Sequence, residues 1–260
     1  FHNNYKVNRR NDFVKISVLT LFPDFINHIR DFSIVGRAIG EGKLDLETVD
    51  IRDFAINKYL QVDDYPYGGG PGMLMQVKPI VEAIESVKEN NSKVYYMSPQ
   101  GKVLTQQKLK ELKEEEHIIL LNGHYEGIDN RVIENYVDEE ISIGDYVLTG
   151  GELASMVVID GVSRLLDGVL SSDESFKDES HYNGLLEHPQ YTRPKEFRGL
   201  TVPDILLSGD HEKIRKYRLI ESIKNTLQKR PDLLENKNLN DEEKDILKDL
   251  LEGGKYNGLY

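Results

Sequence analysis

Three stretches of the chain place glycine and small polar residues directly after an apolar run. They are VYYMSPQG at 94–101, IILLNGHYEG at 118–127 and ISIGDYVLTGG at 141–151. Glycine lets the main chain approach a ligand that any side chain would exclude. Ligands of open parallel sheets bind beyond the carboxyl ends of the strands. We therefore expect the three turns to form one pocket that recognises its ligand through main-chain N–H and C=O groups.

Other chemistries are disfavoured by the residue types. The chain has no cysteine, and so no thiolate nucleophile, disulfide or cysteine-ligated zinc. His117 and His124, like His181 and His188, are seven residues apart with no further ligand, so we expect no metal site. Neither G-x-G-x-x-G after the first strand nor G-x-x-x-x-G-K-[ST] occurs, which disfavours a dinucleotide or P-loop site.

A second group of residues suits RNA. HPQYTRP at 188–194 combines an imidazole, a phenol and a guanidinium, which stack on unpaired bases and contact phosphates. Core packing of Tyr191 and a structural ion pair of Arg193 explain the segment equally well. The net charge of −12 disfavours nucleic acid, but residues 176–230 hold eleven Lys/Arg against eight Asp/Glu. An ordinary solvated helix surface is the alternative reading of that excess.

The elements that must position these residues alternate along the first part of the chain. Strands are predicted at 15–22, 44–51, 94–97, 117–121 and 141–148, and helices at 23–40, 78–89, 105–115, 129–136 and 152–166. This alternation indicates an α/β domain with a parallel sheet. Residues 52–76, which include YPYGGGPGM, form a long loop of the kind that is often functional, and we expect it near the pocket or an interface.

The pattern changes after residue 166. Residues 1–13 are predicted to be an extension, 14–166 the α/β domain, 167–183 a polar, acidic and Ser-rich linker, and 184–254 a small helical domain. Asp210 is predicted to cap a helix that ends before Pro231, and Asn240 with Glu243 to form a capping box at 241–251. Apolar residues lie on one face of the first of these helices and basic residues on the other: Tyr217, Ile220, Ile223 and Leu227 against Arg215, Arg218 and Lys229.

Composition agrees with a globular protein. Hydrophobic residues make up 38% and charged residues 30% of the chain. No apolar run approaches the roughly 20 residues that a membrane helix needs, and the first residues lack the apolar core of a signal peptide. We expect a cytoplasmic protein that does not bind membranes.

Six stretches together resemble a known family. KISVLTLFPDF, YPYGGGPGM, MSPQGK, NGHYEGIDNRV, ISIGDYVLTGGE and GLLEHPQYTRP occur in this order between about residues 14 and 252. They resemble the bacterial tRNA (guanine-N1)-methyltransferase family, which belongs to the SPOUT superfamily of knotted methyltransferases. The resemblance implies an α/β domain whose parallel sheet ends in a C-terminal trefoil knot, followed by a small all-helical tRNA-binding domain.

The resemblance also implies an activity. Family members methylate N1 of the guanosine at tRNA position 37, beside the anticodon, with S-adenosylmethionine as methyl donor. The working unit is a homodimer whose active site is shared between the chains. The resemblance also implies that magnesium takes part in the reaction. We assign no metal ligand, and Glu126 is our one candidate for an indirect contribution to magnesium binding.

The cofactor residues are carried over by position from the family stretches. They are Met97, Ser98, Pro99, Gly123, Tyr125, Glu126, Ile143, Gly144, Asp145, Tyr146, Val147, Leu148, Gly150 and Gly151. His188, Tyr191, Arg193, Arg215 and Arg218 are the expected RNA-binding residues. His124 stands where the family commonly has an arginine, and it receives no role.

Two further residues are expected to carry the chemistry. The family's catalytic base is an aspartate five positions before the glycine of GLL-x-x-P, where this chain has Glu179, preceded by Asp178. We expect Glu179 to remove the N1 proton, with Asp178 as the alternative base; an exposed linker acid is the simpler reading. Arg164 is expected to stabilise the charge that develops on guanine O6. The alternative is that Arg164 is a surface arginine or an ion-pair partner with no catalytic role.

Two other functions compete. A non-catalytic RNA-binding protein with a degenerate cofactor pocket is favoured by the glutamate at position 179. A different nucleotide-dependent enzyme, such as a dehydrogenase, is disfavoured by the missing dinucleotide motif.

Overall fold

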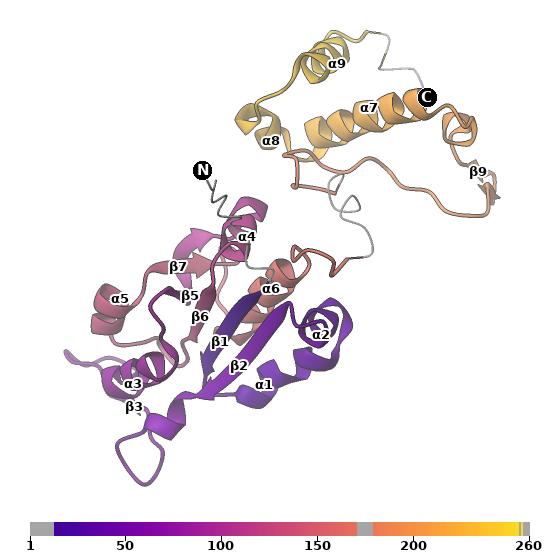
Figure 1. Cartoon of the computed structure of the whole chain (residues 1–260). Helices are drawn as coiled ribbons and strands as arrows, with labels where there is room; N and C mark the ends of the chain where they lie inside the picture. Colours follow the sequence, from indigo (N-terminus) through magenta and orange to yellow (C-terminus); the bar gives the residue numbers. More distant parts are fainter. Residues whose placement is uncertain (1–12, 171–178, 255, 257–260) are drawn as a thin grey trace, which may run out of the picture. The chain divides into compact units, whose positions relative to one another are not determined.

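The structure is a computed structural model that describes residues 13–170, 179–254 and 256 (Figure 1). Contacts within the chain divide it into two compact units, residues 1–172 and 173–260. Most of the N-terminal extension, residues 171–178 of the linker and the alternative base Asp178 lie outside the described residues.

The first unit is built on a five-stranded parallel sheet of order β2-β1-β6-β5-β7. The strands are β1 (Val14–Thr20), β2 (Leu44–Asp50), β5 (Ser92–Val103), β6 (His117–Asn122) and β7 (Glu139–Ser142). The central strand β6 is buried at every position. It reads as an uninterrupted apolar run because both faces of a parallel sheet are covered. The predicted parallel α/β fold is thus confirmed.

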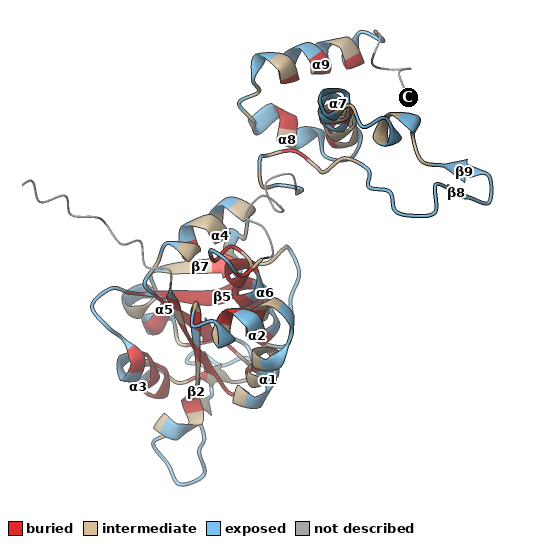
Figure 2. Ribbon diagram, turned by 45° about the vertical axis from the view of Figure 1, so that its right-hand side comes forward, coloured by how far each residue is buried: buried red, intermediate tan, exposed pale blue. Residues whose placement is uncertain are grey.

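Helices cover both faces of the sheet (Figure 1). One face carries α1 (Pro23–Asn27), α2 (Ser33–Gly40), α4 (Gln106–Lys113) and α6 (Glu152–Ser163), and the other α3 (Val77–Val87) and α5 (Asn130–Tyr136). Successive residues of β6 enter opposite cores: Ile118 and Leu120 pack against α6, and Ile119 and Leu121 against α3. Figure 2 shows the buried residues along the strands and the inner faces of these helices.

The single helix predicted at 23–40 is wrong. A 3₁₀ turn, η1 (His28–Asp31), follows α1, and the backbone then leaves the helical region at Phe32. Ser33 has a φ of +51°, which a continuous helix does not allow. Two short helices therefore replace the one that was expected.

The long loop after β2 contains short elements. It begins with the 3₁₀ turn η2 (Ile51–Phe54), and two short strands, β3 (Asp63–Asp64) and β4 (Leu74–Met75), pair near its end. Several of the loop's large side chains are exposed, among them Ile56, Tyr59 and Tyr65, and Tyr67 is fully exposed.

The described part of the second unit contains three α-helices and a hairpin. The helices are α7 (His211–Lys229), α8 (Pro231–Asn236) and α9 (Asp241–Leu251), and the hairpin strands are β8 (Glu196–Phe197) and β9 (Leu200–Thr201), followed by the 3₁₀ turn η3 (Asp204–Leu207). Its core lies between the helices and includes Ile220, Ile223 and Ile246. Both predicted caps are confirmed: Asp210 accepts the N–H of Lys213, and Asn240 and Glu243 form the capping box.

Two features of the second unit were not predicted. Pro231 is the first residue of α8 rather than only the end of the preceding helix, a position that suits its fixed φ. The hairpin strands are two residues long, too short for an alternation pattern. In neither unit do the described helices include one that is long and apolar enough to cross a membrane.

Candidate active site

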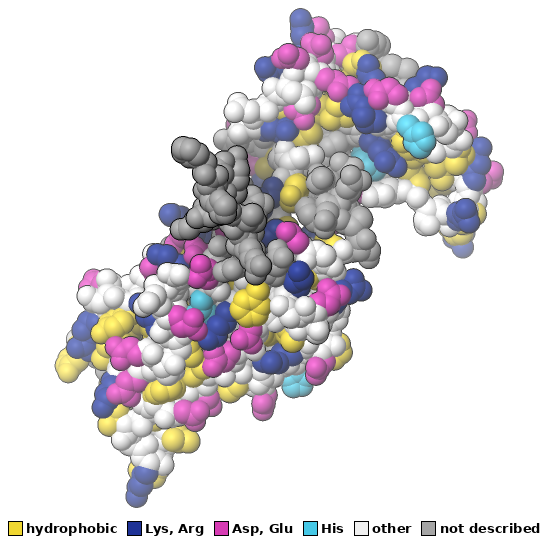
Figure 3. Space-filling model, viewed as in Figure 1, with side chains coloured by type: hydrophobic (Ala, Val, Ile, Leu, Met, Phe, Trp, Pro, Cys, Tyr) yellow, Lys and Arg dark blue, Asp and Glu magenta, His cyan; other side chains and the backbone are white. Residues whose placement is uncertain are grey.

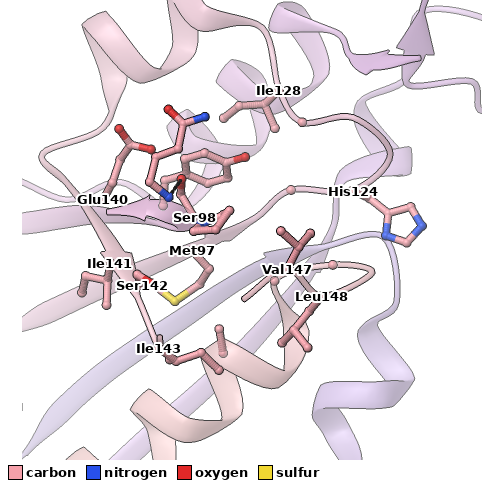
Figure 4. Close-up of a pocket in the computed structure, with 18 of the residues that line it drawn as sticks. Met97, Ser98, His124, Ile128, Glu140, Ile141, Ser142, Ile143, Val147 and Leu148 are labelled. Atoms are coloured by element: carbon pink, nitrogen blue, oxygen red, sulfur yellow. Dashed lines mark hydrogen bonds between the residues drawn. The ribbon is translucent and has the colours of Figure 1, made fainter. Parts of the chain in front are cut away.

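A cavity of about 320 Å³ opens at the carboxyl ends of β5, β6 and β7 (Figure 4). Its walls come mainly from residues 96–100, 123–128 and 140–151. These are the three segments whose composition predicted a common pocket. Figure 4 shows Met97 and Ile143 to the left of Val147 and Leu148, which come from the turn after β7.

The first wall is a bulge in β5. Ile141 of β7 pairs with both Met97 and Lys102, so the residues between them leave the regular ladder. Ser98 and Gln100 therefore line the cavity rather than the sheet. Gly101 allows the two strands to meet again, because a Cβ there would lie 2.4 Å from a backbone carbon of Glu140.

The second wall is the turn after β6, which the end of the long loop holds in place. The N–H of Glu126 donates to the carbonyl of Met73 at 3.1 Å, and the N–H of Met75 donates to the carbonyl of Gly127 at 3.0 Å. Gly72 has a φ of +84°, and a Cβ at this position would lie 2.3 Å from Cγ of Glu126. The end of the YPYGGGPGM stretch thus packs against the turn after β6, which lines the cavity. This agrees with the expectation that the stretch lies near the pocket.

The third wall corrects the strand predicted at 141–148. β7 ends at Ser142, whose hydroxyl donates to the carbonyl of Gly144 at 2.9 Å and accepts the N–H of that residue. Gly144 has a φ of +146°, so the chain turns away from the sheet. Val147 is 82% exposed and Tyr146 54% exposed. The apolar run that suggested a buried strand instead borders an open cavity.

Two glycines join these walls without room for a side chain. The N–H of Gly151 donates to the carbonyl of Gly123 at 3.2 Å, which links the second wall to the third. A Cβ at Gly151 would lie 2.7 Å from Oδ1 of the fully buried Asn122. A Cβ at Gly123 would lie 2.7 Å from the hydroxyl of Tyr96. Glycine at positions 123 and 151 therefore allows the two walls to approach this closely.

Aromatic side chains and a buried glutamate surround His124, which lines the cavity. The ring of His124 lies edge-on to Phe22 at 5.1 Å and to Tyr125 at 5.0 Å between centroids. Glu152, at the start of α6, is buried and accepts a hydrogen bond from the hydroxyl of Thr20 at 2.8 Å. Nδ1 of His124 is buried and has no hydrogen-bond partner within the described part of the chain.

The cavity is electronegative. Glu126 and Glu140 are among the residues that line it, and the described lining contains no Lys or Arg. Burial, with a smaller contribution from the Glu140 carboxylate, raises the pKa of Tyr96 to about 12, so this phenol stays neutral. Such a lining repels phosphate groups and suits a cationic ligand.

All the residues expected to bind the cofactor line this cavity except Asp145, which is exposed. The sequence argument missed Tyr96, Gln100, Glu140 and His124 as lining residues. Tyr96 and Glu140 come from inside strands, where the sequence gives no sign of a ligand. His124 lies within one of the recognised turns, and that neighbourhood was the available signal.

The two residues expected to be catalytic belong to different units. Arg164 is half-buried and caps the C-terminal end of α6, where a cation is favoured by the exposed carbonyl groups. Glu179 lies at the start of the described part of the second unit, and its carbonyl accepts the N–H of Tyr182 at 3.2 Å. Arg164 is thus described with the cavity's unit and Glu179 with the other.

The expected RNA-binding residues differ in their surroundings. Tyr191, Arg193 and Arg218 are exposed, so the alternative of a buried core position for Tyr191 is wrong; His188 is half-buried. Arg215 joins α7 to α9, because its guanidinium contacts Glu212 at 2.7 Å and Glu242 at 2.8 Å. These two carboxylates raise its pKa further, and the guanidinium takes part in a structural network.

The fold and the cavity define an α/β protein with a cavity at the carboxyl edge of a parallel sheet, whose described lining has acidic residues and no Lys or Arg. Residues 14–236 match the model of the family described as tRNA (Guanine-1)-methyltransferase TrmD. The chain belongs to this family.

Curated relatives agree with that assignment. A tRNA (guanine-N(1)-)-methyltransferase of Ruminiclostridium cellulolyticum is 56% identical over 232 residues, which cover 87% of this chain and all of the relative. Proteins of the same name from Clostridium botulinum strain 657 and Clostridium perfringens strain SM101 are each 55% identical, over 91% and 90% of this chain and 98% and 99% of their own lengths. The chain is thus a tRNA (guanine-N1)-methyltransferase by family, and nothing in these similarities supports a non-catalytic protein.

Proposed function

We propose that the protein transfers a methyl group from S-adenosylmethionine to N1 of the guanosine at tRNA position 37. The observation that carries this proposal is the cavity at the carboxyl edge of the sheet. It has glycine-formed walls, two glutamates among its lining residues and no described Lys or Arg. These features suit a ligand with a positive sulfonium and ammonium group better than a phosphorylated nucleotide.

The residues fit the proposed methyl donor. Apolar side chains such as Ile133, Ile141 and Leu148 give a surface for the adenine ring, and main-chain groups of the three walls can bind its polar edge. Glu126 and Glu140 offer negative charge to the cationic part. S-adenosylmethionine supplies an electrophilic methyl group when bound, so the protein itself needs no nucleophilic side chain.

The protein's own chemistry is then confined to the guanine. N1 carries a proton at neutral pH and has no free lone pair for attack. Glu179 is our proposed base: its carboxylate takes this proton, and Asp178 is the alternative. Arg164 is proposed to stabilise the negative charge that moves to O6 as the proton leaves. The cavity walls hold the reacting methyl and N1 in line.

The quaternary arrangement is also proposed. We infer a homodimer in which the cavity of one chain meets the linker and helical domain of the other, so that the site is shared. In support, α6 exposes Leu153 and Val157, four residues apart on one face, and the neighbouring α1 exposes Phe25. Apolar faces of this kind in soluble proteins are typical of interfaces.

Further proposals follow from family membership. The C-terminal part of the sheet domain is proposed to form a trefoil knot, and the helical unit to grip the anticodon stem-loop with His188, Tyr191, Arg193 and Arg218. Magnesium is proposed to act with the substrate, with Glu126 as an indirect contributor. Three or more side chains that could ligate a metal do not gather anywhere in the described ranges, but magnesium is often held by one carboxylate and substrate oxygens. Action on tRNA implies a cytoplasmic location.

Methyl transfer to defined transcripts tests the proposal. The full chain is incubated with labelled S-adenosylmethionine and an unmodified tRNA transcript that has guanosine at position 37. A transcript with adenosine at that position is the matched control. We expect label in the first RNA and none in the second. Equal labelling of both, or of neither, would contradict the proposed specificity.

A further inference from the structure

We propose that the β8–β9 hairpin is an RNA-contacting element that stacks an unpaired base on Phe197 while Arg198 contacts the phosphate backbone. The inference rests on the proposed function, since it names how the tRNA is held. It adds residues to the site that the resemblance did not assign.

The hairpin exposes an aromatic and aliphatic face. Phe197 and Leu200 are directly opposite each other in the antiparallel pair, so their side chains share a face. Phe197 is 59% and Leu200 74% exposed. The N–H of Val202 donates to the carbonyl of Lys195 at 2.9 Å, which extends the pairing and brings Lys195 to the same face.

The charge around this face favours an anionic partner. Residues 193–198 hold three cations and one acid, and all ten residues from 191 to 200 are exposed. Arg193 and Arg198 make no ion pair with any described residue, in contrast to Arg215, which is held by two glutamates. Helix α9, on another part of the same unit, holds five carboxylates and two lysines. Figure 3 shows basic and hydrophobic side chains at the hairpin and mostly acidic ones along α9.

Arg198 and Phe197 are already arranged for stacking. The guanidinium lies over the phenyl ring at 5.1 Å from its centroid. A base on the other face of the ring would complete a stack, with the cation close enough to the nucleotide to contact a phosphate. Single-stranded RNA is commonly bound in this way, by aromatic stacking combined with arginine.

The turn is strained at the residue that would make this contact. Arg198 has a φ of +53° and Gly199 a φ of +81°, as a two-residue type I′ turn requires. Asn-Gly is the preferred pair for such a turn, and a long side chain in the left-handed region is unfavourable. An arginine at a position where asparagine would fold better points to a function for its side chain.

Three exposed substitutions in the full chain test the inference. Phe197→Ala should weaken binding of an unmodified tRNA transcript about tenfold or more, from the loss of one stacked base, and Phe197→Trp should retain it. Arg198→Asn should weaken binding and lower the slope of log affinity against log salt by about 0.7. Because it relieves the turn, it should leave thermal stability equal to or above that of the wild type. Lys248→Asn, which likewise removes one exposed cation but on α9, is the control and should alter neither the tRNA affinity nor the salt slope.

The outcomes separate this inference from the proposed function. If the wild type methylates tRNA and both Phe197→Ala and Arg198→Asn bind tRNA normally, the hairpin proposal is overturned and the function stands. If Phe197→Ala changes the oligomeric state and not tRNA affinity, the hairpin is a protein interface and the proposal is again overturned. If the wild type neither binds nor methylates tRNA, both proposals fail. Unchanged affinity for S-adenosylmethionine in each variant confirms that the cavity is intact.

Discussion

Replacement of Gly151 by alanine should disturb the cavity through backbone geometry alone. The added Cβ would lie 2.7 Å from Oδ1, 3.0 Å from Cα and 3.1 Å from Cβ of Asn122. Ordinary van der Waals contact begins near 3.4 Å, so the turn must move by up to about 0.7 Å to relieve the shortest of these contacts. Asn122 is fully buried at the end of β6 and cannot move away, so the turn itself must shift. That shift strains the hydrogen bond from Gly151 to Gly123, which links two walls.

The expected effects are a loss of stability and of methyl-donor affinity. Overpacking of a tight site costs about 1–3 kcal/mol in unfolding free energy. We expect the affinity for S-adenosylmethionine to fall about tenfold or more, because the walls no longer fit the ligand. The assays are urea denaturation and isothermal calorimetry on the purified full chain.

Gly40→Ala is the matched control. A Cβ at Gly40 meets nothing within 4 Å, and the residue is in α2. This variant should bind the methyl donor normally and be equally stable or more stable by up to about 1 kcal/mol. If Gly151→Ala matches the wild type in both stability and affinity, the close packing of the two walls is not what forms the site.

Three further predictions concern the proposed chemistry and a buried histidine. Glu179→Gln should lower turnover by about 10²–10⁴-fold with unchanged affinity for S-adenosylmethionine, in single-turnover and calorimetric measurements; full activity would move the base to Asp178 or elsewhere. Arg164→Ala should lower the rate of the chemical step by about 10²–10³-fold, whereas a change in tRNA affinity alone would assign it to binding. Burial lowers the pKa of His117, whose ring nitrogens lie 2.8 Å from the hydroxyl of Ser17 and 2.7 Å from that of Ser92. The unfolded chain therefore binds the proton more readily, so unfolding free energy should be fully retained above about pH 6.5 and decline as the pH falls below it. Denaturation at several pH values should show a smaller decline for His117→Gln, and an equal decline would exclude this residue as the cause.

Local sequence patterns predicted those parts of the fold that depend on neighbouring residues. The apolar run of β6 indicated a strand covered on both faces, and Asn240 with Glu243 indicated the start of α9. Such signals depend on burial and on hydrogen bonds within one turn. The location of the cavity was predicted for another reason: each strand end has its own local glycine signal, and a parallel sheet brings such ends to one edge.

Other parts depend on contacts between segments far apart in sequence. The bulge of β5 follows from its register with β7, and Glu140 lines the cavity because of that pairing. The apolar residues after Ser142 suggested a strand because sequence alone cannot tell a cavity wall from a buried core. Similarly, the ion pair of Arg215 with Glu242 spans 27 residues, so local patterns do not predict that this expected RNA-binding residue also links two helices.

The central claim is that the cavity and the unit that contains Glu179 cooperate to methylate guanine at N1. The most direct test is mass spectrometry of nucleosides from an unmodified tRNA transcript after incubation with the protein and S-adenosylmethionine. We predict 1-methylguanosine, located in the fragment that contains position 37 and absent when Glu179 is replaced by Gln. Methylation at another guanine atom, or no methylated nucleoside despite measurable binding of both tRNA and S-adenosylmethionine, would contradict the account.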